Sequence, residues 1–541
     1  MARGTLAEMP TSQIELSVRC DGLADKDVLS KSDPVCVMYV QPAGAEEGDW
    51  IEAGRTEQAR DTLSPEWEKR FHVDFRFEER QSLKFDVYDW DRETQSLEDQ
   101  DFLGRCETTL AQVVAAKCFA TQLEGGRGRG PRSSAKGTIS ITAEELEENR
   151  EIVTLQFAAE DLDKEDFFGL SDPYYVVSKE ASDGHFVVVK KGEVVMCNLN
   201  PTWKEFAIPT RDLCNNNHDR PLKIEVFDWD DGGKDDFIGG FTASLATLLD
   251  APSSKSFPLV SEKKRRKKKH YVDSGQLKVI KTAVAKEDSF MDYIQGGMSI
   301  NFSVAIDFTL SNGDPHSPTS LHFMAPGGQD NQYVTAIKAV GGIIEDYDTD
   351  KMFPALGFGA IVPPENLASH YFFLNMHPDD PYCKGVSGLL EAYQTSLESV
   401  QLYGPTNFAP VIRHVTRFAK AYADGSQYFV LMIVTDGEIT DMETTIYAII
   451  EASRLPMSII IIGVGDEDFE AMKTLDGDEG RLRSGRIKAC RDIVQFVELR
   501  KFLSRSGMWD KGLLAREVLA EVPKQLTDWA KMQGIRPTVP K

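Results

Sequence analysis

Residues 83–91 read LKFDVYDWD, and residues 222–230 read LKIEVFDWD. Three further segments repeat in step with them: SDPVCVMYV with SDPYYVV, TLSPEWEKRF with NLNPTWKEF, and DFLG with DFIG. Asp33 and Asp172 stand 139 positions apart, as do Asp89 and Asp228. A repeat of this length indicates a duplicated domain, because solenoid repeats span only about 20 to 50 residues.

Short apolar or alternating runs, rich in Val, Phe, Tyr and Ile, fill each copy and are separated by Gly, Pro, Asn and Asp clusters. This pattern predicts an all-β sandwich of about eight strands in each copy. We place the first sandwich at residues 13–143 and the second at 150–285. Each carries a polar insertion before its last strand, GGRGRGPRSSAKG in the first and EKKRRKKKH in the second.

The pattern changes after the second sandwich. MSINFSVAID, YFVLMIVTDG and MSIIIIGVG read as strands buried on both faces of a parallel sheet, with amphipathic helices such as VSGLLEAYQTSLESV between them. These segments predict an α/β, doubly wound (Rossmann-like) domain at residues 298–530. We expect a linker at 286–297 and a frayed tail at 531–541.

Composition and charge limit the partners and the compartment that this chain can have. Asp and Glu number 86 against 61 Lys and Arg, and this gives a formal charge of -25 that excludes nucleic acid as a partner. No signal peptide and no apolar run long enough to span a bilayer is visible in the sequence. The eight cysteines form no CxxC motif, which predicts reduced thiols in the cytoplasm.

Ten aspartates recur in the same order in the two copies. In the first copy they are Asp27, Asp33, Asp89, Asp91 and Asp101, and in the second Asp166, Asp172, Asp228, Asp230 and Asp236. In an extended chain residues i and i+2 point to the same side, so each D-W-D segment brings two carboxylates together. Calcium accepts about 6 to 8 oxygen ligands in flexible geometry. Aspartate is also common in turns, but turn preference does not explain this recurrence.

These motifs resemble C2 domains. The resemblance implies that the aspartates hold calcium at one end of each sandwich and that lipid phosphate completes the coordination. In the second copy the D-x-D-x5-D spacing from Asp228 to Asp236 matches the family. The first copy has four extra residues between Asp91 and Asp101, and Asp99 competes with Asp101 for the fifth position.

Two features of the second copy predict membrane contact. Apolar side chains lie between Asp166 and Asp172, at Phe167, Phe168 and Leu170, where they either enter a bilayer or fold back onto the sandwich. The insertion carries a basic run of Lys263, Lys264, Arg265, Arg266, Lys267, Lys268 and Lys269. Such a run favours an anionic leaflet, and a nuclear localisation signal or a solvated loop are the alternatives.

Polar residues also follow the buried strands of the α/β domain, where open sheets bind ligands. They are Asp307, Thr309, Ser311, Thr406 and Asp436. Two carboxylates and three hydroxyls suit octahedral magnesium or manganese. The segment D-F-T-L-S resembles the D-x-S-x-S motif of the metal-ion-dependent adhesion site in von Willebrand factor A domains, with Thr in place of the first Ser. The alternative is an A domain whose metal site no longer binds partners.

Two C2-like copies, DYIQGG, DFTLSNG and RDIVQFV together resemble the copine family. The resemblance implies a cytoplasmic protein that moves to anionic phospholipid of plasma or internal membranes with calcium, and recruits protein partners through its A domain. The alternative is a hydrolytic or transferase enzyme that uses the A-domain metal site. We expect no enzyme, because no GxxxxGK[ST], GxSxG or HExxH motif occurs and no His lies beside the metal-site residues in the sequence.

Overall fold

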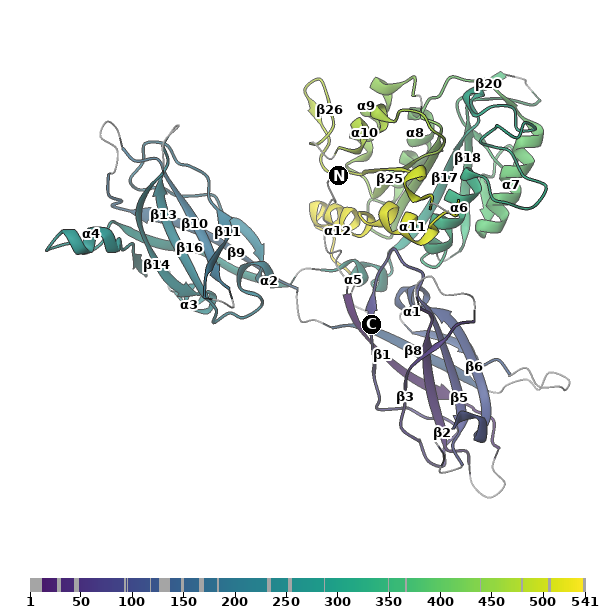
Figure 1. Cartoon of the computed structure of the whole chain (residues 1–541), viewed down its shortest axis with the longest axis horizontal. Helices are drawn as coiled ribbons and strands as arrows, with labels where there is room; N and C mark the ends of the chain where they lie inside the picture. The colour runs from purple at the N-terminus through teal and green to yellow at the C-terminus, as the bar shows by residue number, and fades with distance from the viewer. Residues whose placement is uncertain are drawn as a thin grey trace. The chain divides into compact units, whose positions relative to one another are not determined.

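The computed structural model describes residues 12–26, 31–42, 48–91, 94, 96–116, 118–125, 137–146, 150–164, 170–181, 184–230, 235–251, 255–286, 288–348, 350–364, 367–437, 439–477, 480–504 and 507–538. The chain folds into two compact units (Figure 1). One unit joins Met1–Leu146 with Phe290–Lys541, and the other is Glu147–Ser289.

The first copy of the repeat forms two four-stranded antiparallel sheets, with strand orders β4-β1-β8-β7 and β3-β2-β5-β6. Its elements are β1 (Ser12–Asp21), β2 (Pro34–Val40), β3 (Ile51–Arg55), β4 (Phe71–Phe75), β5 (Ser82–Asp89), η1 (Leu97–Asp99), β6 (Asp101–Thr109), α1 (Leu110–Ala115), β7 (Phe119–Gln122) and β8 (Thr138–Glu145).

The second copy repeats this topology, with sheets β12-β9-β16-β15 and β11-β10-β13-β14. Its elements are β9 (Glu151–Glu160), β10 (Pro173–Glu180), β11 (Phe186–Lys191), β12 (Phe206–Pro209), α2 (Thr210–Cys214), β13 (Pro221–Asp228), β14 (Asp236–Ser244), α3 (Leu245–Leu249), β15 (Ser256–Pro258), α4 (Glu262–Lys267) and β16 (Gln276–Lys286). The predicted pair of all-β sandwiches is confirmed.

Period-two burial explains these sandwiches. Along β13, Leu222, Ile224 and Val226 are fully buried, while the residues between them are half-buried. Trp203 fills the same core, and its indole Nε1 donates to the Pro173 carbonyl at 3.2 Å. Trp67 does the same in the first copy. The repeated Pro-x-Trp segment therefore anchors the loop before β4 or β12 to the core.

The third domain has a central sheet in the order β21-β18-β17-β24-β25-β28, and β22 pairs with β18. Its four central pairings are parallel. The strands of this sheet are β17 (Ser299–Asp307), β18 (Met352–Phe358), β21 (Phe372–Phe373), β22 (Tyr382–Lys384), β24 (Gln427–Thr435), β25 (Met457–Gly463) and β28 (Val494–Glu498). Short strands outside it are β19 (Ala360–Val362), β20 (Leu367–Ser369), β23 (Gln401–Leu402), β26 (Arg483–Ser484) and β27 (Ile487–Lys488).

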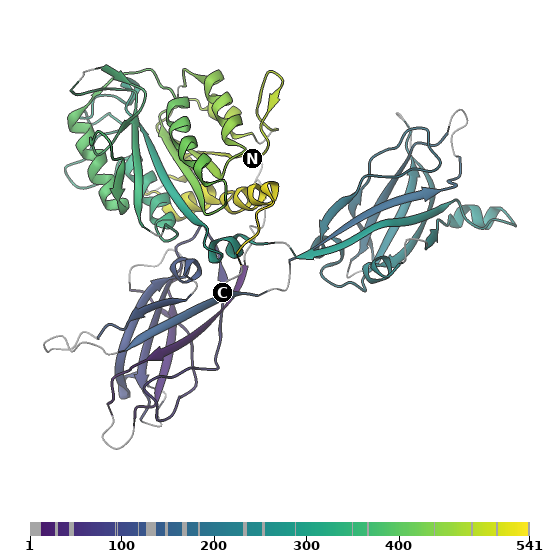
Figure 2. The ribbon, with the colours of Figure 1, turned by 180° about the vertical axis from the view of Figure 1, so that it is seen from behind.

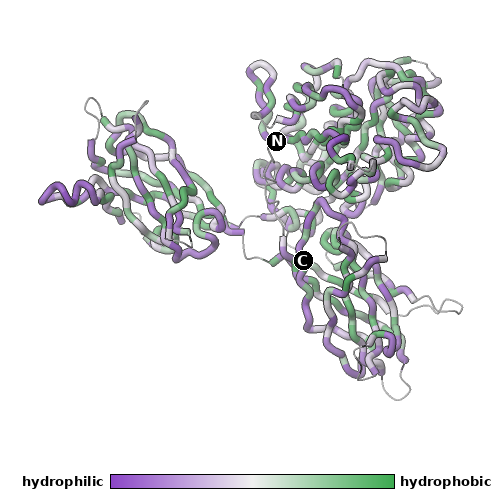
Figure 3. The backbone as a smooth tube through the Cα atoms, viewed as in Figure 1, coloured by the Kyte–Doolittle hydropathy of each residue, from purple (hydrophilic) through white to green (hydrophobic). Residues whose placement is uncertain are grey.

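Helices cover both faces of this sheet (Figure 2). They are α6 (Gln332–Ile344), α7 (Gly385–Ser399), α8 (Ala409–Ala419), α9 (Met442–Ala452), α10 (Glu470–Asp476), α11 (Lys511–Leu519) and α12 (Val522–Gln533), with 3-10 turns η2 (Leu310–Asn312), η3 (Lys420–Tyr422) and η4 (Leu499–Phe502). Along β24, Val430 and Met432 join the apolar cluster that includes α6, α11 and α12, whereas Leu431 and Ile433 join the cluster with α8 and α9. The predicted doubly wound architecture is confirmed, and the central strands are mostly hydrophobic (Figure 3).

Two segments expected as a linker and a tail contain packed residues. The expected linker contains a helix, α5 (Phe290–Gln295), whose Phe290, Met291 and Ile294 are buried. In the segment expected as a frayed tail, Ile535 packs against the main core, and its carbonyl accepts a 3.1 Å hydrogen bond from the Tyr293 hydroxyl. Apolar side chains of both segments pack into one shared core. The polar residues around them made these segments look unstructured in the sequence.

Within the same unit, the first sandwich shares that core with the α/β domain. The Phe77 ring lies 4.8 Å from those of Phe290 and Tyr347, measured between centroids. Beside it, Thr109 Oγ1 and Gln112 Nε2 each donate to the Asp346 carboxylate at 2.9 Å. The sequence predicts three separate domains in series, and in the structure the first sandwich and the α/β domain share one compact unit while the second sandwich forms the other.

Candidate metal sites

Strand register brings the repeated aspartates that the structure describes to one end of each sandwich. In the second copy Pro173 pairs with Asp228 and Asp228 pairs with Asp236, so the start of β10, the end of β13 and the start of β14 meet. In the first copy Pro34 pairs with Asp89 and Asp89 with Asp101. The two copies therefore have the same arrangement.

A main-chain hydrogen bond links the two aspartate loops. The Asp172 amide donates to Asp228 Oδ1 at 2.6 Å, and the Trp229 amide donates back to the Asp172 carbonyl at 3.1 Å. Asp228 is only 1% exposed, whereas Asp230 is half-buried and Asp236 exposed. In the first copy the Asp33 amide likewise donates to Asp89 Oδ1 at 2.6 Å. Each site thus has a buried carboxylate held in place and others facing solvent.

Several predicted site residues lie outside the described residues: the expected calcium ligands Asp27 and Asp166, and the expected membrane-contact residues Phe167 and Phe168. Within the described part of the chain, no three His, Cys, Asp or Glu side chains gather as a metal-binding group. Leu170 is described, and 42% of it is exposed.

Register also separates the two candidates for the fifth position of the first copy. Asp101 begins β6 and pairs with Asp89, as Asp236 begins β14 and pairs with Asp228. Asp99 instead lies in η1 and accepts a 3.0 Å hydrogen bond from Thr94 Oγ1. Asp101 therefore holds the position that corresponds to Asp236, and the four extra residues are accommodated before it.

The copies differ in residues that sequence reasoning missed. Gln58 Nε2 donates to Asp33 Oδ2 at 2.9 Å in the first copy, and the matching residue of the second is Val194. Asp235 occupies the position of Gln100; its Oδ2 accepts from the Tyr174 hydroxyl at 2.7 Å. Burial and this carboxylate raise the pKa of Tyr174 to about 12. Aligning the two copies was the signal that could have found these residues.

The basic run is not uniform. Lys264 turns inward: its side chain is 18% exposed, and Nζ lies 2.7 Å from Asp163 Oδ2. The other six cations of the run are exposed, and Arg265 NH1 pairs with Glu262 Oε1 at 3.1 Å. Lys264 therefore differs from the other members of the predicted membrane-binding set, because it already holds a protein carboxylate. The run forms α4 and the turn after it (Figure 3).

In the α/β domain the predicted metal-site residues come together at the carboxyl ends of β17 and β24. Asp307 Oδ1 accepts from Thr309 Oγ1 at 2.6 Å, and Oδ2 accepts from Thr435 Oγ1 at 2.6 Å. Thr309 Oγ1 lies 2.9 Å from Ser311 Oγ. The loop before α8 joins them, because the Thr406 carbonyl accepts from the Thr440 amide at 2.9 Å.

The buried carboxylates fit a divalent cation. Among the described residues, neither carboxylate oxygen of Asp436, which is 2% exposed, accepts a hydrogen bond of standard geometry. Burial and Asp436 raise the pKa of Asp307 to about 7, although hydrogen bonds from Thr309 and Thr435 oppose the shift. Burial also raises the pKa of Asp436, although the nearby Ser311 hydroxyl opposes this. Two such carboxylates beside hydroxyl groups match the hard oxygen ligands of magnesium or manganese.

A histidine that is distant in the sequence lies next to this site in the structure. His322 is fully buried, stacks on Phe308 and Tyr333, and places Nδ1 2.7 Å from the Tyr393 hydroxyl. Burial lowers its pKa to about 3, although the Asp307 carbonyl opposes the shift. A neutral, enclosed imidazole in an aromatic stack serves packing.

Comparison with known proteins matches residues 15–124 and 152–259 to the C2 domain and residues 320–538 to the family described as Copine. Among solved structures, one described as BON1-C2B is 26% identical, with 26% of this chain and 94% of that chain covered and a TM-score of 0.22. The calcium-bound C2A and C2B domains of extended synaptotagmin 2 are 16% identical, with 52% and 99% covered and a TM-score of 0.21.

C2 domains are calcium-binding modules with relatives that bind phospholipid, and neither matched family is in general a family of enzymes. No helix in the described residues is long and apolar enough to cross a membrane. The matches follow the same order along the chain as the two sandwiches and the α/β domain. Two C2 domains followed by a copine domain are the architecture of the copine family, and this chain belongs to that family.

Proposed function

We propose that this chain binds anionic phospholipid membranes when calcium rises, moves from the cytoplasm to plasma or internal membranes, and recruits protein partners there through its A domain. The observation that best supports this proposal is the register of Asp228 with Pro173 and Asp236. This register brings Asp228 and Asp236 to one end of the second sandwich. The same register recurs in the first copy with Asp89. Two such ends on one chain gain from effective concentration.

The negative charge of the aspartates explains why membrane binding would depend on calcium. Without a cation, the clustered carboxylates repel one another and the anionic leaflet, as does a chain with a net charge of -25. Bound calcium neutralises them and offers open coordination positions to lipid phosphate. The Asp172 amide keeps the Asp228 carboxylate in place at 2.6 Å, so little ordering remains for the binding step.

The second sandwich carries more of the affinity in this proposal. In the first, Gln58 already donates to Asp33 Oδ2, an oxygen that calcium needs. In the second, the corresponding residue is Val194, and Asp235 adds negative charge beside Asp236. More ligand charge strengthens calcium binding. The exposed Leu170, together with Phe167 and Phe168, enters the bilayer once the rim is neutral.

The A domain holds a divalent cation in this proposal. Asp307, Thr309, Ser311, Thr406 and Asp436 are the residues that would hold magnesium or manganese, and the bound ion would supply an open position for a partner's oxygen. The support is the pair of buried carboxylates, one of which accepts no hydrogen bond of standard geometry from the described residues. Leaving both charged and uncompensated at neutral pH is costly, and a cation removes that cost.

Co-sedimentation of the full chain with phosphatidylserine vesicles, with calcium and with chelator, tests the switch. We expect calcium-dependent binding that Asp228→Asn with Asp230→Asn abolishes, and that Asp89→Asn with Asp91→Asn weakens less. Asp212→Asn is the matched control, because Asp212 is an exposed residue of α2, which adjoins the start of β9 at the opposite end of the same sandwich. Vesicle binding that ignores calcium contradicts the proposal.

A further inference from the structure

The basic helix and the aspartate loops emerge from the same end of the second sandwich. Gln276, the first residue of β16, pairs with Glu160, the last residue of β9. Asp163 therefore follows β9 into the first aspartate loop just where α4 leads into β16. Because both segments belong to one rigid sandwich, a fixed connection between them would set where the cations of α4 stand relative to the calcium ligands.

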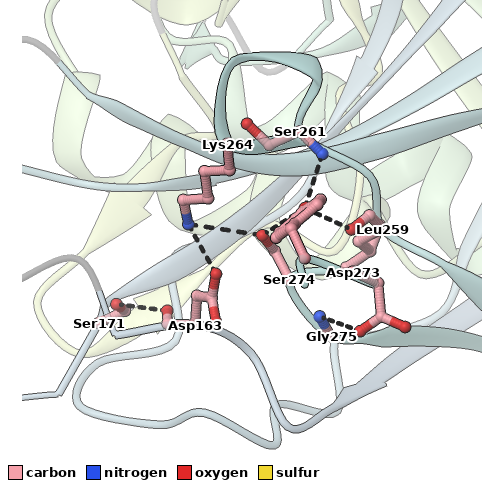
Figure 4. Close-up of polar contacts among 9 residues, drawn as sticks. Asp163, Ser171, Leu259, Ser261, Lys264, Asp273, Ser274 and Gly275 are labelled. Atoms are coloured by element: carbon pink, nitrogen blue, oxygen red, sulfur yellow. Dashed lines mark hydrogen bonds and ion pairs between the residues drawn. The ribbon is translucent and has the colours of Figure 1, made fainter. Parts of the chain in front are cut away.

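A partly buried ion pair between Lys264 and Asp163 makes that connection (Figure 4). Lys264 Nζ donates to Asp163 Oδ2 at 2.7 Å and to Ser274 Oγ at 3.4 Å. Burial alone would raise the pKa of Asp163, but hydrogen bonds from Lys264 and Ser274 outweigh it and lower the pKa. The Lys264 side chain is 18% exposed and that of Asp163 37%, so solvent screens this pair less than a fully exposed one.

Further hydrogen bonds fix both partners. The Asp163 amide donates to the Ser274 carbonyl at 3.0 Å, and Ser171 Oγ donates to the Asp163 carbonyl at 3.3 Å. On the helix side, the Ser261 amide donates to the Tyr271 hydroxyl at 2.8 Å, and that hydroxyl lies 2.8 Å from Ser274 Oγ. Ser171 directly precedes the ligand Asp172. The network thus runs without a break from the calcium loop to both ends of α4.

The first sandwich provides an internal comparison. Its Ser32 Oγ donates to the Ala24 carbonyl at 3.4 Å, as Ser171 Oγ donates to Asp163. Ala24 therefore occupies the position of Asp163 and has no carboxylate for a cation. The ion pair belongs to the second copy alone, which is the copy that carries the basic run.

We propose that Lys264, by binding Asp163, holds α4 beside the calcium-binding end, so that the exposed cations of the run and the aspartate rim meet one anionic bilayer as a single surface. Lys264 is a positioning residue, and Lys263, Arg265, Arg266, Lys267, Lys268 and Lys269 face the lipid. This inference rests on the proposed function. A helix fixed in place contributes its charges without an ordering cost on binding.

Two substitutions that each remove one positive charge distinguish a residue that positions α4 from a residue that contacts lipid. Lys264→Gln removes the clamp, and Lys267→Gln removes one exposed cation of the same helix. Each exposed cation near an anionic leaflet contributes up to about fivefold in affinity. We expect Lys267→Gln to weaken calcium-dependent binding of the full chain to phosphatidylserine vesicles by at most about fivefold, and Lys264→Gln by more than that. Asp163→Asn should match Lys264→Gln, and the double variant should be no weaker than either.

A lipid-free measurement tests the clamp on its own. Hydrogen exchange of residues 262–271 in the full chain without calcium should accelerate in Lys264→Gln and stay unchanged in Lys267→Gln, because only the first loses the bond to Asp163. Equal exchange in both variants, or equal loss of vesicle binding, overturns this inference. Calcium-independent or absent vesicle binding by the unsubstituted chain rejects the proposed function, and the exchange result still decides whether the clamp exists.

Discussion

The main-chain amide of Asp172 donates a 2.6 Å hydrogen bond to the carboxylate of Asp228, which is almost completely buried. Asp33 and Asp89 make the same contact in the first sandwich, also at 2.6 Å. The bond joins the loop that precedes β10 to the end of β13, and so it holds two predicted calcium ligands together by main-chain structure. These two predicted ligands therefore keep a fixed position relative to each other before any cation binds.

The second sandwich should lose its calcium when these carboxylates are neutralised. Asp228→Asn with Asp230→Asn replaces two anionic ligands by neutral amides, and calcium affinity depends on ligand charge. Isothermal titration of the full chain should show that site weakened by more than about tenfold. Asp212→Asn removes an exposed charge from the same sandwich and should leave the titration unchanged. An unaltered calcium affinity of every site in the double variant would contradict the assignment.

The first sandwich should bind calcium more tightly when Gln58 is removed. Gln58→Val copies Val194 of the second sandwich and frees Asp33 Oδ2 from its 2.9 Å hydrogen bond. A hydrogen bond of about 0.5 to 1.5 kcal/mol corresponds to a gain of roughly twofold to twelvefold in affinity. The titration is made with Asp228→Asn and Asp230→Asn already present, so that only the first site responds. Weaker binding would mean that Gln58 instead orients Asp33 for the ion.

The α/β domain should become less stable as pH rises from about 4 to about 7. The folded chain keeps a proton on Asp307 up to a pKa of about 7, whereas its ordinary value is 3.8. Over that window the folded state binds more protons than the unfolded state, so the free energy of unfolding falls with rising pH. Differential scanning calorimetry without divalent cations should show this decline, and Asp307→Asn should reduce it.

Magnesium should reverse that loss above pH 7. The ion binds the deprotonated carboxylates, so its effect on the melting temperature should be larger at pH 7.5 than at pH 5.5. At about 100 times the Kd it would add about 2.7 kcal/mol, which is roughly 5 to 10 °C for a domain of this size. Asp436→Asn should abolish the difference between the two pH values. An equal shift in the substituted and unsubstituted chains would place the magnesium elsewhere.

Contact between the first sandwich and the α/β domain should depend on Phe77. Phe77→Ala removes a buried ring that lies 4.8 Å from Phe290 and from Tyr347, and such changes typically cost about 3 to 5 kcal/mol. Limited proteolysis should then cleave near α5, which this contact covers. Phe102→Ala in the same sandwich, half-buried and away from the α/β domain, is the control. Equal cleavage rates in the two variants would show that Phe77 does not hold the contact.

The sequence by itself determined the two sandwiches, the doubly wound domain and most of the candidate ligands. These features depend on local patterns: alternation along β13, continuous apolar strands such as β24, and the D-W-D segment at Asp228, where spacing alone puts two carboxylates on one side. The internal duplication supported each of these predictions, because every motif could be compared with its counterpart in the other copy.

Only the tertiary structure decided which neighbours these residues have. Lys264 belongs to a run of seven cations, yet it alone reaches Asp163, 101 positions away in the sequence. Strand register placed Asp101, and not Asp99, opposite Asp89. The apolar side chains of α5 and Ile535 pack into a shared core that neither segment predicts by itself. Period and spacing describe one segment at a time, whereas these contacts join segments far apart in the chain, and packing of the whole fold selects them.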